Sequence, residues 1–165
     1  MDTMDKQIRD ALISAIRAEG LDAVGTFENA SFSKCSAGVA SVGIESFSAS
    51  PVGMNDYLGQ TQGSASISEV YGKRAVLTAA IDIYTPKALR AAGCGEGAEK
   101  VYAALAAALS LGLRAKEINI SAAAFDTATG MFRQRVSALM DAYFTAQTDE
   151  YGLLLNFELK GVIRT

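Results

Sequence analysis

The sequence predicts an α+β fold in which a mainly antiparallel sheet carries two helices packed on one side. Two segments show the apolar spacing of a helix without an equally good strand pattern, and two helices cannot cover both faces of a sheet. Several longer segments alternate apolar and polar residues and are separated by turn residues, as in hairpins. The 165 residues contain no repeat, linker or charge block, so we expect residues 1–165 to form a single domain.

The first element is an amphipathic helix. Apolar residues between Met4 and Ile16 recur at helical spacing, and Gly20 provides a stop signal. Residues 39–47 alternate as in a strand, with Val42 and Ile44 on one face. Proline, glycine, asparagine and aspartate then predict a loop at about residues 48–66, which we interpret as mobile.

The strongest strand pattern covers residues 67–84, where apolar side chains alternate up to the stop at Pro86. A glycine-rich turn is expected at residues 93–97. A second helix follows at residues 98–111, where alanine raises helix propensity and Gly112 is the expected end.

The C-terminal third is predicted to be β structure. Residues 117–121 alternate, and the turn at residues 126–130 predicts a hairpin. Residues 132–145 fit a period of two and a helical stripe equally well, and the preceding turn favours a strand. Residues 153–163 alternate as an amphipathic strand, so the expected order is α-β-β-α-β-β-β.

Composition disfavours several classes of function. The formal net charge is −3, which gives no general attraction to nucleic acid or to an anionic membrane. Without histidine, the chain lacks the commonest general base and a common metal ligand, and its two cysteines have no CxxC spacing. We therefore expect no enzyme activity, no cofactor and no metal. Residues 1–17 lack the pattern of a signal peptide, and no apolar run reaches the ~20 residues that span a membrane, so neither export nor a membrane partner is expected.

Two features nevertheless suggest ligand chemistry. Residues 93–98 match G-x-G-x-x-A ahead of a helix, which is the pattern of a dinucleotide site, but they do not directly follow a strand as that site requires. An ordinary loop is the simpler interpretation. Cys94 near a helix start is a candidate reactive thiol without a histidine to activate it.

The charged residues give a weaker signal. Arg133 and Arg135 share a face if their segment is a strand, where they would meet phosphate, an acidic partner or solvent. The carboxylates do not cluster in sequence: Asp82 is alone in its strand, and Asp126 is typical of a turn.

Short segments distributed over most of the chain carry a family resemblance. They are VGI at residues 42–44, DYLG at 56–59, EVYGK at 69–73, LTAAIDIYTP at 77–86, FDTATGMF at 125–132 and LNFELKG at 155–161. In these segments the sequence resembles the tail terminator, or tail completion, proteins encoded in prophages of Gram-positive bacteria. These are strand and turn patterns rather than catalytic motifs.

The resemblance implies a mainly antiparallel curved sheet with two helices packed on one side. It also implies a homo-oligomeric ring of about six subunits that caps the tail tube and joins it to the head connector. The expected partners are the tail tube protein and the head-tail connector proteins, with DNA passing through the ring. The expected location is the virion tail, assembled in the cytoplasm of the bacterial host.

Our leading hypothesis is therefore a structural phage tail protein without catalytic residues. The candidate interface residues are Leu155, Phe157, Arg133, Arg135, Tyr57 and Leu58. The alternatives are another neck or tube component, a monomeric protein-binding adaptor, and a small nucleotide-binding enzyme that uses residues 93–98.

Overall fold

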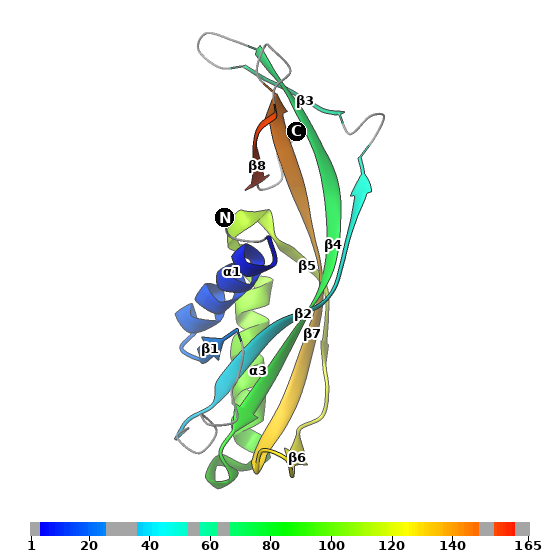
Figure 1. Ribbon diagram of the computed structural model, residues 1–165. Coiled ribbons are helices and arrows are strands. Elements are labelled where there is room, and N and C mark those ends of the chain that lie inside the picture. Colours follow the sequence, from blue (N-terminus) through cyan, green and yellow to red (C-terminus); the bar gives the residue numbers. More distant parts are fainter. Residues whose placement is uncertain (1–3, 26–35, 53–56, 63–66, 149–153, 161–165) are drawn as a thin grey trace.

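The computed structural model describes residues 4–25, 36–52, 57–62, 67–148 and 154–160. Within these residues, two α-helices lie on one side of a single, curved, eight-stranded sheet (Figure 1). Neighbouring strands are antiparallel, except that β1 (Asp22–Val24) runs parallel to β2 (Val39–Pro51). The predicted α+β class, with a mainly antiparallel curved sheet, is confirmed.

Two long strands form the axis of the sheet. β4 (Ile67–Thr85) pairs with β7 (Met131–Thr148) from Val70–Gln147 to Thr85–Phe132. At ~3.3 Å per residue, these strands have a contour length of about 60 Å. Shorter strands lie end to end along both outer edges: β2 and β3 (Tyr57–Gln62) along β4, and β6 (Ala124–Asp126), β5 (Arg114–Ile120) and β8 (Leu154–Lys160) along β7.

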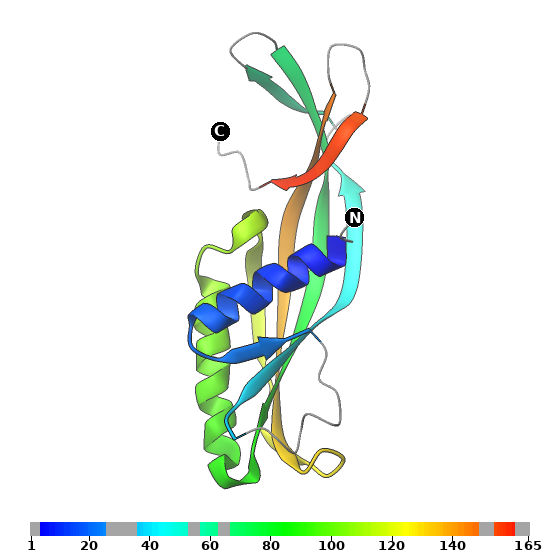
Figure 2. The same ribbon diagram turned by 60° about the vertical axis from the view of Figure 1, so that its left-hand side comes forward.

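The helices cover only part of this length. α1 (Met4–Ala18) and α3 (Arg90–Ala106) lie over the half of the sheet formed by β2, β5 and the neighbouring parts of β4 and β7 (Figure 2). The other half, made of β3, β8 and the adjoining ends of β4 and β7, projects beyond both helices. We call this projecting half the arm.

The core fills the space between the helices and the sheet. Every second residue of the central strands faces it, because side chains alternate between the two faces of a strand. The largest fully buried apolar side chains are Ile8, Leu12 and Ile16 of α1, Val101 of α3, Val42 of β2, Leu77, Ile81 and Ile83 of β4, and Val136 and Met140 of β7. This packing decides the ambiguous residues 132–145, which belong to strand β7.

The N-terminal helix agrees with the sequence pattern. Ile8, Leu12 and Ile16 form its buried stripe. Gly20 follows the helix with φ +84°, a left-handed conformation that favours glycine, and its N–H donates to the carbonyl of Arg17 at 3.0 Å. The predicted helix and its stop signal are confirmed.

The second helix begins earlier than predicted. The expected glycine-rich turn at residues 93–97 is wrong, because these residues lie inside α3. A Cβ atom at Gly97 would lie 2.8 Å from Cγ2 of Ile83, and one at Gly93 would lie 2.9 Å from Cβ of Leu89. These glycines thus let the helix pack closely against the sheet and the preceding turn.

The same helix also ends earlier, at Ala106 rather than Leu111. Ala107 is extended, and a 3-10 turn (Ser110–Gly112) follows. This path buries both Leu109 and Leu113. Gly112, with φ +65°, therefore belongs to the turn and does not close the helix.

The strands are longer and more numerous than predicted. β2 extends to Pro51. Strands β1, β3 and β6 were not predicted, since two three-residue strands and the hexamer YLGQTQ show no clear alternation. Of the expected loop at residues 48–66, residues 48–51 and 57–62 are in strands, while 53–56 and 63–66 lie outside the described residues. The strands at 67–84 and 117–121 and the turn at 126–130 are confirmed. In that turn, the N–H of Gly130 donates to the carbonyl of Asp126 at 2.8 Å.

Candidate functional site

The sheet face opposite the helices carries a compact charged cluster formed by Glu45, Asp82, Arg133 and Arg135, which we call the Asp82 cluster. Oδ1 of Asp82 accepts hydrogen bonds from Nε of Arg133 at 3.1 Å and from Nε of Arg135 at 2.9 Å. Oδ2 accepts a further bond from Nη2 of Arg135 at 3.0 Å. Nη1 of Arg135 donates to Oε1 of Glu45 at 2.6 Å. The cluster thus joins β2, β4 and β7.

A bulge brings Glu45 into this cluster. The register between β2 and β4 shifts between Ile44 and Ser46, so Glu45 is the extra residue of the bulge. A bulge redirects a side chain relative to the regular alternation of a strand. The carboxylate of Glu45 therefore reaches Arg135, which lies two strands away.

The electrostatics of the Asp82 cluster favour the charged forms of Asp82 and Arg135. Burial opposes ionisation of Asp82, but hydrogen bonding to Arg135 and the positive charges of both arginines outweigh it, and the pKa of Asp82 is lowered. The hydrogen bond to Asp82 in turn raises the pKa of Arg135. The two arginines share a face, as expected for a strand. Both arginines are bound to acids of their own chain. The sequence had suggested that Asp82 stands alone in its strand, but the structure pairs it with both arginines.

A second charged cluster, formed by Arg74, Lys116 and Asp141, is called the Asp141 cluster. Asp141 is only 8% exposed, and its Oδ2 lies 2.9 Å from Nζ of Lys116 and 3.3 Å from Nη2 of Arg74. Lys116 is the bulge residue of β5, where the register to β7 shifts between Ala115 and Glu117. Both clusters therefore combine a carboxylate of a central strand with a charged side chain from a bulge.

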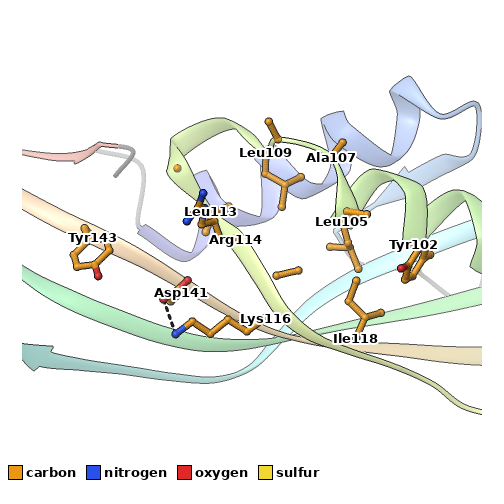
Figure 3. Close-up of a pocket in the computed structure, with 14 residues that line it drawn as sticks. Tyr102, Leu105, Ala107, Leu109, Leu113, Arg114, Lys116, Ile118, Asp141 and Tyr143 are labelled. Carbon is orange, nitrogen blue, oxygen red and sulfur yellow. Dashed lines mark ion pairs between the residues drawn. The ribbon is translucent and has the colours of Figure 1, made fainter. Parts of the chain in front are cut away.

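Asp141 and Lys116 of this cluster line an open groove near one of its ends (Figure 3). The groove has a volume of about 1110 Å³ and lies where the end of α3, the 3-10 turn and the start of β5 meet β7. Its accessible apolar walls are formed by Ala106, Ala107, Ala108 and the half-buried Ile118. The buried side chains of Leu105, Leu109 and Leu113 lie behind them, and Tyr102 stands at the other end of the groove. The charged end of the groove is lined by two basic side chains, Arg114 and Lys116, and by one acidic side chain, Asp141. This end is therefore positive.

The groove coincides with a junction in the edge of the sheet. β5 begins opposite Asp141, whereas the pairing of β8 with β7 reaches only Tyr143. The charged end of the groove, which Arg114, Asp141 and Tyr143 line, therefore lies beside this junction.

The arm holds the predicted interface residues Tyr57 and Leu58. Both lie in β3, and Tyr57 is 43% exposed. Tyr57 contacts its strand partner Tyr71 edge to face, with ring centroids 5.6 Å apart. The hydroxyl of Tyr71 donates to Oε2 of Glu69 at 2.5 Å, and this hydrogen bond is the main cause that raises the pKa of Tyr71.

The predicted interface residues are not gathered in one place. Leu155 and Phe157 lie in β8, where Phe157 is paired with Ala146, but their side chains lie outside the described part of the structure. Arg133 and Arg135 lie near the opposite end of β7, and Tyr57 and Leu58 lie along the far edge of β4. Four of the six residues therefore lie on the two outer strands of the arm, whereas the two arginines lie near the opposite end of the sheet.

Residues 93–98 do not form a phosphate-binding loop, because they are helical and Gly93 and Gly97 are packed against other residues. Cys94 is not at the helix start but inside the helix, fully buried. Its Sγ lies 3.0 Å from Oγ1 of Thr85 and 3.7 Å from the carbonyl oxygen of Ile83. A buried thiol packed in this way is out of reach of a substrate. Cys35 lies outside the described residues.

Sequence reasoning missed the Asp141 cluster and the groove. A partial signal existed: in a strand over residues 133–143, Arg133, Arg135 and Asp141 lie on one face. The strand register and the two bulges, which bring in Glu45 and Lys116, had no signal in the sequence.

Among the described residues, no group of three or more potential ligands of the types Cys, Asp and Glu is placed to hold a metal ion. No helix in the described ranges has both the length and the apolar character needed to cross a membrane. Comparison of the chain with protein-family models and with curated proteins finds no match.

Proposed function

We propose that this chain is a structural protein of a phage tail, in which several copies assemble into a ring that caps the tail tube and joins it to the head connector. The proposal combines the tail-terminator resemblance of the sequence with one observation on the fold. That observation is the arm, in which the sheet extends beyond the helices that cover its other half.

An uncovered stretch of sheet is a hazard for a monomer, because its edges and faces attract other chains. In an assembly, the same features provide the contacts between subunits. A rotation between neighbouring subunits that closes on itself limits growth to a ring. The arm therefore favours a self-assembling protein over a monomeric adaptor.

The structural role does not depend on a reactive group. The polar side chains of the Asp82 cluster bind one another and link three strands, which suits a rigid subunit. The virion tail is accordingly the proposed location, and the tail tube and head-tail connector proteins are the proposed partners.

Sedimentation velocity over a series of protein concentrations tests the proposal. A closed species of about six subunits, present over a wide range of concentrations, is the expected result. A species that grows without limit contradicts ring closure. A monomer at every concentration contradicts self-assembly, and addition of tail tubes then separates a protein that assembles only on the tube from an adaptor.

A further inference from the structure

The groove beside β5 has two chemically different ends. Apolar side chains line one part, with Tyr102 51% exposed at its rim. The charged end holds Arg114 and Lys116, and Arg74 also contacts the carboxylate of Asp141. Positive side chains thus outnumber negative ones there. A suitable occupant combines an apolar or aromatic body with a carboxylate.

The arm carries a surface of this kind. Tyr57, Tyr71 and Glu69 lie together through the ring contact and the hydrogen bond described above. The two tyrosines are held against each other, so little side-chain entropy is lost when they bind. Tyrosine is enriched in protein interfaces because its ring is apolar and its hydroxyl is polar.

The surface formed by Tyr57, Tyr71 and Glu69 cannot fill the groove of the same molecule. β3 lies along the outer edge of β4, whereas the groove lies along the outer edge of β7, on the opposite side of the central pair. A contact between these two surfaces must therefore join different copies. Because the two surfaces differ, the contact runs head to tail, which is the type that generates rings.

We propose that the groove receives the arm of a second copy, with Tyr57 and Tyr71 against the apolar walls and Glu69 beside Arg114 and Lys116. This inference rests on the proposed self-assembly and names the surfaces that carry it.

Charge reversal on each side tests the contact. Arg114→Glu reverses the charge of a groove residue that is not an ion-pair partner of Asp141, whose partners are Lys116 and Arg74. Because position 114 is directly opposite Asp141 in the register of β5 and β7, the fold of this variant is checked before its mass is compared. Glu69→Lys changes the arm at an exposed position. Lys87→Glu, near the opposite end of α3, is the matched control for the same charge change. Sedimentation velocity gives the mass of each variant, and circular dichroism checks its fold.

Each single reversal is expected to weaken assembly at least tenfold, while the control assembles as the wild type does. The double variant, and an equimolar mixture of the two single variants, should regain the assembled mass, because opposite charges again face each other. Should Arg114→Glu fail to fold, Tyr102→Ser replaces it as the groove variant and should also weaken assembly.

Two other results overturn the proposal, and they are distinguishable. If the wild type assembles and the folded single variants assemble equally well, the arm and groove do not form the contact, although self-assembly stands. If the wild type is a monomer at every concentration, the proposed self-assembly fails and this contact fails with it.

Discussion

The carboxylate of Asp82 and the guanidinium of Arg135 form a two-point ion pair between directly opposed residues of the two central strands. Nε and Nη2 of Arg135 donate to the two oxygens of Asp82 at 2.9 and 3.0 Å, and the two residues are register partners. A planar fork of this kind fixes geometry better than a lysine ammonium would. The pair therefore helps to hold β4 and β7 in one register.

Replacement of Asp82 by asparagine should lower the free energy of unfolding by about 1.5–3 kcal/mol, because hydrogen bonds to a charged group are lost and two arginines keep their charge. Urea denaturation at pH 7 measures this change. Asp10→Asn, at an exposed position in α1, is the control and should change stability by less than about 0.5 kcal/mol. Equal stability of the two variants would contradict a stabilising role for the Asp82 cluster.

The contribution of Asp82 to the free energy of unfolding should decrease as the pH falls. Its pKa is lowered in the folded protein, so folding favours the ionised form. The stabilisation is complete above the unfolded pKa of about 3.9 and disappears as the pH falls through the lower folded pKa. The difference in unfolding free energy between wild type and Asp82→Asn should therefore be constant from about pH 5 to 7 and shrink towards pH 3. A difference that grows on acidification would exclude this linkage.

Two glycines of α3 should respond oppositely to the same substitution. Gly97→Ala places a Cβ atom 2.8 Å from Cγ2 of Ile83, so we expect a loss of about 1–3 kcal/mol from overpacking. Gly95→Ala meets no atom within 4 Å and should gain about 0.5–1 kcal/mol through helix propensity. Thermal unfolding of both variants measures the contrast, and a stabilised Gly97→Ala would show that the close approach of helix and sheet is not tight.

Substitutions in β8 test the predicted interface strand. Replacing Leu155 or Phe157 with aspartate should abolish assembly or folding, since each adds a charge to the apolar set of an amphipathic strand. Circular dichroism separates a folding defect from an assembly defect, and sedimentation velocity reports the mass. Asn156→Asp, at the intervening position, is the control. Normal assembly of both Leu155→Asp and Phe157→Asp would show that β8 is not part of the interface.

Nucleotides should leave the melting temperature unchanged. Residues 93–98 are helical, and Gly93 and Gly97 lack the open backbone approach that a phosphate requires. A ligand that binds only the folded state raises stability by mass action, so thermal shift with a panel of mono- and dinucleotides is a direct test. A melting temperature that rises with nucleotide concentration would instead support the alternative of a nucleotide-binding enzyme.

The sequence by itself determined the elements whose signal is local. The helical stripe of Ile8, Leu12 and Ile16, the alternation in residues 67–84 and the turn closed by Gly130 each follow from periodicities or conformational preferences of a few neighbouring residues. The α+β class followed from the same local signals, because a sheet with only two helices must leave one face uncovered.

Only the tertiary structure decided the start of α3, the register of β4 with β7 and the two charged clusters. Considered only within their local sequence, glycines 93 and 97 suggest a turn. In the folded protein they lie in a helix, where the absence of a Cβ atom allows close packing against Leu89 and Ile83. Asp82 is 53 residues from Arg135, and Glu45 is 90 residues from it. Such pairs depend on strand register and on bulges, which are set by the packing of the whole sheet rather than by any short stretch of sequence.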